Sequence, residues 1–322
     1  MRTYVLRRVL QTIPLLLGIS LITFLLLQLA PGDFLNQMAE NPGISAETID
    51  AMRIRFGLDK PWYIQYGIYL KNVLFHLDFG ESFARHQPVF EVLSDGFNNT
   101  LLLAGAAALI TCGFAIPLGV IAAVRQHSWV DRTLSLLAFV WLSIPEILAA
   151  LVLLMMAART GWFPVGGMRS LDYDELDGLG QFLDVLHHLA LPALVVGLIP
   201  LASRMRQMRG SLLDVLRLDY VTTARAKGLS ERVVITKHAL RNALNPMITL
   251  FGYTLGALVS GSFIVEIIFS WPGLGRITLD AILQQDQYLV MGAVLMASLV
   301  LIIGNLIADL LLAIADPRIS YD

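Results

Sequence analysis

One carboxylate lies in the middle of a long apolar stretch. Glu146 follows Pro145 within residues 133–158, where most other side chains are apolar. A charge at the centre of a helix in lipid costs roughly 2.5–3.5 kcal/mol on insertion scales, so such a residue usually has a function or a polar partner. Glu146 is therefore a candidate for lining a translocation cavity and meeting an ammonium group or another cation. An interhelical hydrogen bond, with the carboxyl group protonated, is the alternative.

A second candidate site is the basic, amphipathic stretch 204–242, which contains no proline. Its periodicity is helical on both sides of Gly228, and glycine readily adopts the left-handed conformation that ends a helix. The sequence therefore predicts a short helix, a glycine turn and a second helix. Small side chains before the turn, including Thr223, Ala224 and Ala226, would let another surface approach closely. Docking onto a partner protein and contact with anionic lipid both fit this composition.

Several kinds of chemistry have no support in the sequence. The lysines are Lys60, Lys71, Lys227 and Lys237, and none stands in the Gly-x-x-x-x-Gly-Lys-Ser/Thr spacing that cradles a phosphate. The single cysteine, Cys112, excludes an internal disulfide and a cysteine-cluster metal site. There is no polybasic tail for nucleic acid. We therefore expect no catalytic residue, no metal and no cofactor of the chain's own.

The composition indicates that these residues are held by membrane-spanning helices. Of the 322 residues, 56% are hydrophobic and 15% are charged, whereas soluble domains average about 25% charged. A span needs about 20 mostly apolar residues. Six stretches qualify, which predicts an all-α, polytopic membrane protein of six transmembrane helices. They are residues 9–30, 100–124, 133–158, 186–203, 243–268 and 289–314.

The distribution of basic residues predicts the orientation of the chain. If the N-terminus is cytoplasmic, the inner segments hold 15 of the 23 Lys and Arg residues, although they are much shorter than the outer ones. Both termini are then cytoplasmic, and 204–242 is a cytoplasmic loop. The outer segment 31–98 is too long for a simple connector and has helical patches at 46–56 and 62–75, so we expect an ordered extracytoplasmic cap. The predicted domains are 1–30 (N-terminus and first span), the cap 31–98, and a core of five spans, 99–322.

The stretch DYVTTARAKGLSERVVITKHALRNALNP resembles the coupling loop of bacterial ABC importer permeases of the dipeptide/oligopeptide/nickel branch. Gly228 matches the glycine of the family's loop. Thr222, Thr223 and Ala224 occupy its Glu-Ala-Ala positions, and Arg241 stands where the general pattern has proline, as in the peptide branch's own form. LRRVLQTIPLLLGISLITFLLLQLAPGD, FGLDKPWYIQY, LDFGESF, SWPGLGR and the final DPR are similar to that branch in the same order. The long first outer segment is typical of its B-type subunit.

The resemblance implies the ABC type I importer permease fold and a permease subunit, not an enzyme, in a bacterial plasma (inner) membrane. Its partners would be a second homologous permease, two ATPase subunits that hold ATP and Mg²⁺, an extracytoplasmic substrate-binding protein and the lipid bilayer. ATP-driven closure of the ATPases would move the coupling loop and switch the cavity between inward and outward access. The residues expected to couple to the ATPase are Asp219, Tyr220, Thr223, Ala224, Arg225, Ala226, Lys227 and Gly228.

Peptides are the expected substrate, and nickel chelates, glutathione-like compounds and sugars are alternatives within the same architecture. Two other protein classes were weighed. An ion-coupled secondary transporter often shows internal repeats, and no convincing repeat is present. An intramembrane enzyme needs a nucleophile and base or a metal cluster within the spans, and the candidates are scattered singly. Both classes are less consistent with the sequence than an importer permease.

Overall fold

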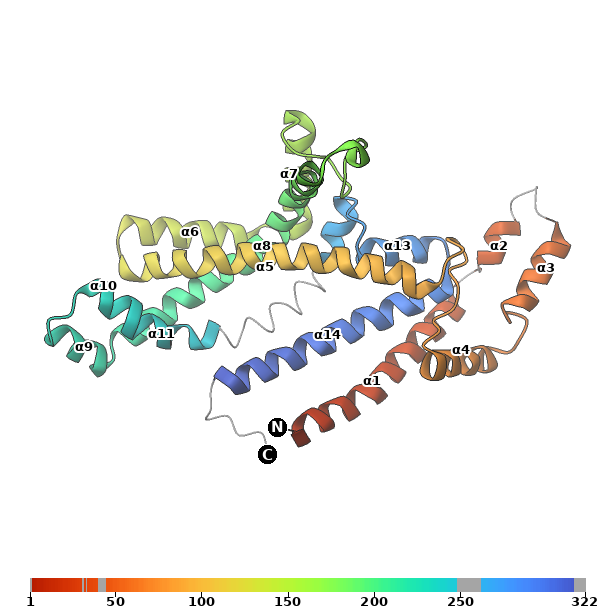
Figure 1. The fold of residues 1–322 in the computed structure, drawn as a ribbon, viewed down its shortest axis with the longest axis horizontal. Helices are drawn as coiled ribbons and strands as arrows, with labels where there is room; N and C mark the ends of the chain where they lie inside the picture. The colour runs from red at the N-terminus through yellow and green to blue at the C-terminus, as the bar shows by residue number, and fades with distance from the viewer. Residues whose placement is uncertain (1, 31, 33, 40–44, 248–261, 316–322) are drawn as a thin grey trace. The chain divides into compact units, whose positions relative to one another are not determined.

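The computed structural model describes residues 2–30, 32, 34–39, 45–247 and 262–315, which form mainly helices (Figure 1). The long helices are α1 (Arg2–Leu29), α5 (Val89–Val124), α8 (Gly178–Leu216) and α14 (Gln287–Ala315). Those of intermediate length are α3 (Ala46–Arg55), α4 (Trp62–His76), α6 (Trp129–Ser143), α7 (Glu146–Thr160) and α13 (Leu274–Leu283). The short ones are α2 (Phe34–Ala39), η1 (Tyr173–Glu175), α9 (Asp219–Ala226), α10 (Glu231–Val233), the π-helical η2 (Val234–Ala239) and α11 (Leu240–Ala243).

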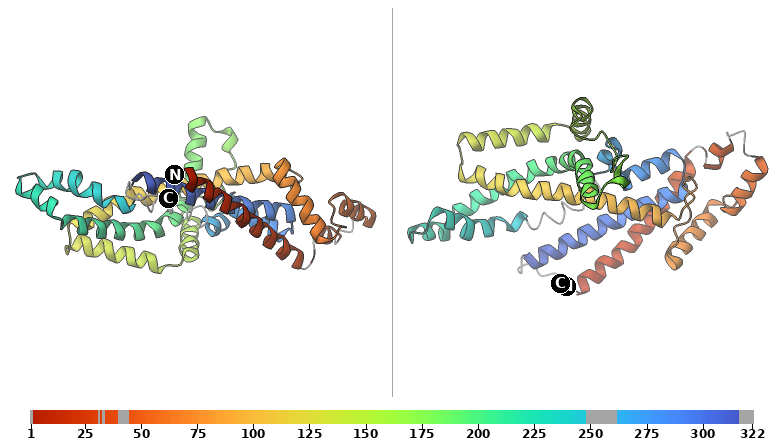
Figure 2. Two further views of the ribbon diagram at one scale, coloured as in Figure 1. Left: turned by 90° about the horizontal axis from the view of Figure 1, so that it is seen from below. Right: turned by 45° about the horizontal axis from the view of Figure 1, so that its top comes forward.

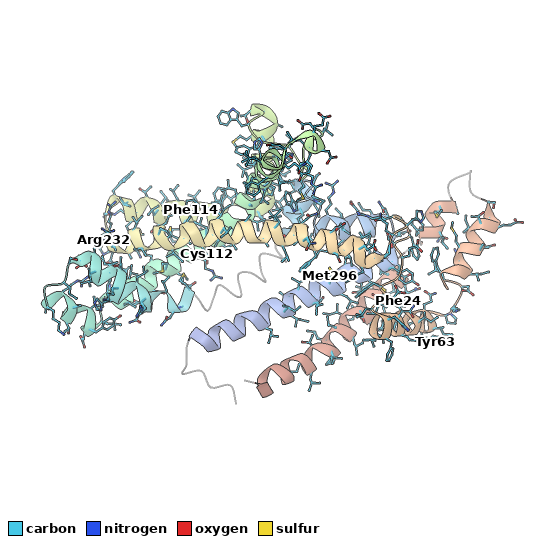
Figure 3. The ribbon with its side chains drawn as sticks, viewed as in Figure 1. Phe24, Tyr63, Cys112, Phe114, Arg232 and Met296 are labelled. Carbon is cyan, nitrogen blue, oxygen red and sulfur yellow. The ribbon has the colours of Figure 1, made fainter. Side chains whose placement is uncertain are left out.

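Four of the described helices are long and apolar enough to cross a membrane, and the pair α6 and α7 makes a fifth if the two count as one span. The predicted spans 9–30, 100–124, 186–203 and 289–314 fall on the four long helices. Most of the predicted fifth span, residues 248–261, lies outside the described residues, as does the C-terminal Asp-Pro-Arg sequence. Large apolar side chains are exposed along these helices, as Leu109 (77%) and Phe114 (58%) are on α5 (Figure 3). Such a surface requires lipid or another protein against it.

The predicted third span, 133–158, is not a single helix. The chain forms α6 and α7 instead, and the two helix axes are bent by 99° at a break after Ser143 (Figure 2). Ile144 is extended, with ψ of 122°, because the ring of Pro145 disfavours the helical conformation of the residue before it. Pro145 then stands directly before α7, where its missing N–H removes no helical hydrogen bond.

The chain divides into two compact units. One contains Leu101–Trp271, and the other combines Arg2–Thr100 with Pro272–Val300. In the first unit, α5, α7 and α8 enclose a core of small and branched side chains that includes Ala107, Ala150 and Val195. Two glycines let the backbones of α5 and α8 approach closely, since a Cβ at Gly119 would lie 2.7 Å from the Met205 carbonyl oxygen and one at Gly197 would lie 2.9 Å from that of Ala107.

We expect Gly119→Ala to destabilise the protein, because the new methyl group would have to displace backbone at 2.7 Å. Such overpacking costs about 1–3 kcal/mol. Gly113 on the same helix is the matched control, because a Cβ there meets nothing within 4 Å and alanine favours the helix. The thermal unfolding midpoint of the detergent-purified protein should fall for Gly119→Ala and stay level or rise for Gly113→Ala. Equal shifts in the two variants would contradict the close approach.

The second unit contains the predicted cap segment together with α13 and the start of α14. The cap helices α3 and α4 confirm the two helical patches predicted at 46–56 and 62–75. Asp286, fully buried before α14, accepts hydrogen bonds from Ser82 Oγ (2.6 Å) and the Ala84 N–H (3.1 Å). Asn99 Nδ2 donates to the Pro272 carbonyl oxygen (2.9 Å). The bonds to Asp286 join the loop after α4 to the turn between α13 and α14, and the bond from Asn99 joins α5 to the segment before α13.

Candidate functional site

The short helix α9 is held against α8 by one apolar edge. Val221 and Ala224 lie three residues apart and therefore face the same side of α9, where they are 0% and 6% exposed. They pack with Met208 and Leu212 of α8 and with Val234 of η2 in one buried cluster. Figure 1 shows α9, α10 and α11 grouped beside the C-terminal end of α8. An isolated helix of eight residues is unstable in water, so α9 depends on this packing.

The turn after α9 has the conformation that the sequence predicts. Gly228 adopts φ of +78°, a value that favours glycine, and the chain reverses into α10. Arg225 and Glu231 bridge the two arms of the turn, with Arg225 Nε and Nη2 donating to the two carboxylate oxygens at 3.1 and 2.7 Å. The bond from the Arg225 guanidinium lowers the pKa of Glu231 below its usual value. Because both side chains are exposed, the pair sets the shape of the turn more than the stability of the fold.

Tyr220 attaches α9 to the helical arm that follows the turn. Its hydroxyl accepts a hydrogen bond from Asn242 Nδ2 at 2.7 Å and donates to the His238 carbonyl oxygen at 3.4 Å. That carbonyl belongs to η2, a π-helical stretch whose wider turn leaves irregular backbone groups to be satisfied. Asn242 was not among the predicted site residues, since an exposed asparagine has no distinctive signal in a sequence.

The predicted coupling residues thus form one contiguous element, although they do not all face outward. We call α9, the Gly228 turn and α10 the coupling element, residues 219–233. The exposed members of the predicted set are Asp219, Tyr220, Thr223, Arg225, Ala226, Lys227 and Gly228. Ala224 is buried and belongs to the packing edge instead. Arg225 already has a partner in Glu231, which makes Lys227 the cation of the turn that is better placed to meet an external acidic group.

We expect Gly228→Ala to weaken the action of this element with little effect on the rest of the protein. A side chain at φ of +78° costs roughly 1–2 kcal/mol, and relief of that strain would change the angle between α9 and α10. Gly210→Ala in α8 is the matched control, because a Cβ there meets nothing within 4 Å. The thermal midpoint should fall slightly for Gly228→Ala and stay level or rise for Gly210→Ala, whereas substrate uptake by the assembled protein should fall only for Gly228→Ala. If the Gly228→Ala variant takes up substrate as well as the wild type does, the turn has no functional role.

An ion pair between α8 and the start of α6 holds in place the helix against which α9 packs. Arg209 of α8 donates through Nε and Nη2 to the two carboxylate oxygens of Asp131 at 2.6 and 2.8 Å. Asp131 is 5% exposed at the start of α6 and also accepts from the His127 N–H at 2.9 Å. The pair ties the α5–α6 turn to α8. Sequence reasoning missed it because the partners are 78 residues apart and each looks like an ordinary charged residue of a polar loop.

Glu146 has a different position from the one predicted. It is the first residue of α7, directly after the break, rather than a residue near the middle of a continuous helix. The N–H groups of a first helical turn have no partner within the helix, and their positive end favours a carboxylate. The side chain is half-buried. Part of the cost of placing Glu146 in an apolar segment is therefore offset by the helix that it begins.

The comparisons with known proteins agree with this architecture. Residues 115–321 match the family described as binding-protein-dependent transport system inner membrane component, and residues 1–104 match its N-terminal family. The oligopeptide transport system permease protein AppB of Bacillus subtilis is 40% identical over the full length of both chains. The dipeptide transport system permease protein DppB of Escherichia coli K12 is 39% identical, covering 100% of this chain and 99% of that protein.

The fold has a counterpart among solved structures. A chain of the MetNI methionine ABC transporter, solved in inward-facing conformations, superposes with a TM-score of 0.51 and 18% sequence identity. The match covers 69% of this chain and 97% of that one. The fold class expected from the sequence, an importer permease made of helices, is confirmed at this level. The chain belongs to the family of binding-protein-dependent transport system inner membrane components.

Proposed function

We propose that this chain is the B-type permease subunit of an ATP-driven importer that brings di- or oligopeptides into the cell. The full-length identity of about 40% to an oligopeptide permease and a dipeptide permease carries this proposal. Nickel chelates, glutathione-like compounds and sugars are the alternative substrates. The complete complex would contain a second homologous permease, two ATPase subunits that bind ATP and Mg²⁺, and an extracytoplasmic substrate-binding protein.

In the proposed orientation six spans cross the inner membrane, both termini are cytoplasmic, and the coupling element faces the ATPase. The contacts of α9 support this role. The apolar edge of α9 is fixed to α8, while its exposed residues and Lys227 are free to be covered by a partner surface. A push on that surface would move α8 with it, because Val221 and Ala224 leave no room for α9 to slide alone.

We propose that the substrate-binding protein docks on the second unit, which contains the cap segment. The hydrogen bonds of Asp286 support this, because they join the cap segment, through Ser82 and Ala84, to the turn between α13 and α14. A protein that docks there would meet a preformed surface rather than separate loops.

We further propose that Glu146 lines the translocation cavity and meets the ammonium group of a peptide. Glu146→Gln should reduce uptake of cationic and zwitterionic peptides severalfold and leave assembly intact, because glutamine keeps the size of the side chain and removes its charge. Glu91→Gln, at an exposed position near the start of α5, is the control. Uptake of labelled peptides by proteoliposomes provides the measurement. Unchanged uptake of cationic and neutral peptides alike would leave Glu146 with only its local role at the start of α7.

The central experiment is purification of the complex through a tag on this chain, followed by uptake measurements in proteoliposomes. An ATPase subunit should copurify in mild detergent, and labelled dipeptides should accumulate only with ATP and the binding protein. If no ATPase copurifies, the importer proposal fails. If the intact complex takes up labelled nickel chelate but no peptide, the architecture stands and the peptide substrate is wrong.

A further inference from the structure

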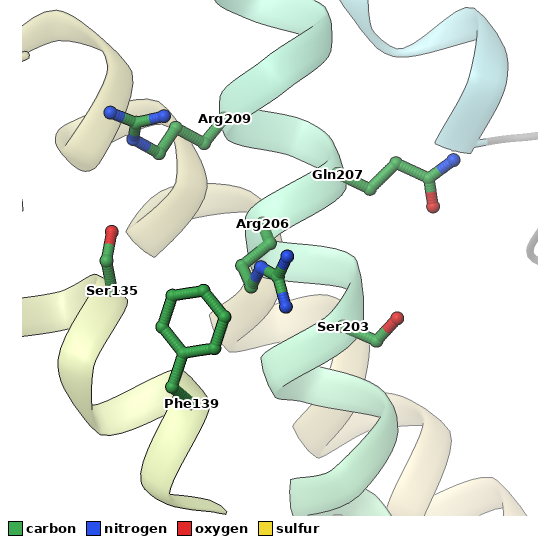
Figure 4. A pocket seen from close by; sticks show the side chains of 6 residues that line it. All are labelled: Ser135, Phe139, Ser203, Arg206, Gln207 and Arg209. Atoms are coloured by element: carbon green, nitrogen blue, oxygen red, sulfur yellow. The ribbon is translucent and has the colours of Figure 1, made fainter. Parts of the chain in front are cut away.

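A recess of about 590 Å³ lies between α6 and α8 (Figure 4). The side chains that line it all carry hydrogen-bond donors, except for one aromatic ring. Figure 4 shows Arg206 across the Phe139 ring, with Arg209 and Ser135 on one side and Ser203 and Gln207 on the other. The six lining residues are Ser135, Phe139, Ser203, Arg206, Gln207 and Arg209.

The charge of the recess is positive. Arg206 is exposed, and its guanidinium carbon lies 4.3 Å above the centroid of the Phe139 ring, so the side chain is oriented without being neutralised. Arg209 is balanced by its ion pair with Asp131. Gln207 Oε1 accepts a hydrogen bond from Arg204 at 3.2 Å. That bond leaves the amide N–H groups of Gln207 as donors. The recess therefore favours an anion with several acceptor oxygens.

The apolar surface beside the recess indicates which anion fits. Leu136, Phe139 and Val140 share one face of α6 and are 62%, 52% and 49% exposed. A free inorganic anion would leave this face uncovered. A molecule with a phosphate group at one end and hydrocarbon chains at the other would cover both surfaces.

The recess also lies at the level where both helices change from apolar to polar. On α8 the run Leu198–Ala202 gives way to Ser203 and the arginines, and α6 begins with Trp129, which is 78% exposed. Exposed tryptophans and arginines at the ends of spans are typical of the headgroup region of a bilayer. We propose that this recess binds the phosphate headgroup of an anionic phospholipid, with Arg206 as its central ligand and the α6 face against the acyl chains. The proposal rests on the chain being embedded in a membrane and not on the transported substrate.

Native mass spectrometry of the purified complex in nanodiscs of mixed phosphatidylglycerol and phosphatidylcholine tests this. Wild-type protein should retain phosphatidylglycerol in preference to phosphatidylcholine. Arg206→Gln should weaken that retention about fivefold, the effect of one arginine near an anionic surface. Arg232→Gln is the matched control, because Arg232 is exposed on α10 (Figure 3) and is not among the residues that line the recess. Arg206→Lys should keep part of the preference, since it keeps the charge and loses the planar group.

Three results would overturn the proposal. Equal retention of phosphatidylglycerol by wild type and Arg206→Gln would show that the recess does not hold lipid. Equal losses in Arg206→Gln and Arg232→Gln would indicate a general effect of net charge. Displacement of the lipid by millimolar inorganic phosphate or by a dipeptide would assign the recess to a free anion or to a substrate carboxylate. Retention that resists both competitors and depends on Arg206 would support it.

Discussion

Replacement of Val221 with aspartate should abolish uptake by the assembled importer. Val221 is fully buried between α9, α8 and η2, and the new carboxylate would have no cation in that cluster to pair with. An uncompensated buried charge costs about 3–5 kcal/mol, more than the packing of an eight-residue helix can supply. We therefore expect α9 to detach from α8 while the spans stay folded. Uptake should be lost, and ATP hydrolysis, if the ATPases remain bound, should no longer respond to substrate.

The neighbouring residue provides the control for this prediction. Thr222→Asp introduces the same charge one position along, where the side chain is exposed. It should leave the attachment of α9 intact and have a much smaller effect on uptake. Both variants should be compared for expression, copurification of ATPase and uptake in proteoliposomes. If Val221→Asp keeps wild-type uptake, or if the two variants lose it equally, the buried edge of α9 is not what transmits motion.

Removal of the Asp131 carboxylate should produce a large loss of stability in the first unit. Asp131→Ala leaves the Arg209 guanidinium, the His127 N–H and the Ser135 hydroxyl without their acceptor. Arg209 is 26% exposed and would recover some hydration, so we expect a loss of about 2–3 kcal/mol in the free energy of unfolding. The thermal midpoint should fall by several degrees.

A double-mutant cycle separates the ion pair from the other effects of substitution. Arg209→Met should cost at least as much as Asp131→Ala, because it leaves a carboxylate that is 5% exposed with weaker partners. The double variant should lose clearly less than the sum of the two single losses, since neither orphaned charge remains. Additive losses would show that the two side chains contribute independently and that the bidentate contact adds little.

Local sequence patterns predicted a large part of this fold because they depend on neighbouring residues. The helical periodicity around Trp62 and the glycine at position 228 specify a helix and a left-handed turn whatever the rest of the chain does. The same reasoning predicted the helix and turn of residues 219–228 through their small residues and Gly228. It did not predict that Ala224 is buried, because the orientation of a short helix is set by what it packs against, here Met208 and Leu212.

The features that the sequence did not predict depend on distant partners or on the competition between two local rules. The bonds from Arg209 to Asp131 and from Ser82 to Asp286 join residues 78 and 204 positions apart, and neither pair has a distinctive spacing. At Pro145 the apolar run of 133–158 favours one long helix, whereas proline disfavours a helical residue before it. The steric effect of the proline ring is the stronger of the two, and Glu146 therefore lies in the first turn of a helix rather than in its interior.

Helix α8 has 39 residues and a length of about 58 Å, almost twice the thickness of the hydrocarbon core of a bilayer. Its last turns carry Met208 and Leu212, so the coupling element is attached near one end of a long rod. Pro192 and Pro200 each remove a hydrogen bond from its middle. In the proposed orientation, the helix would be stiff where the ATPase pushes and more compliant around Pro192 and Pro200. A small sideways displacement at the end that carries the coupling element would then bend the helix near these two prolines.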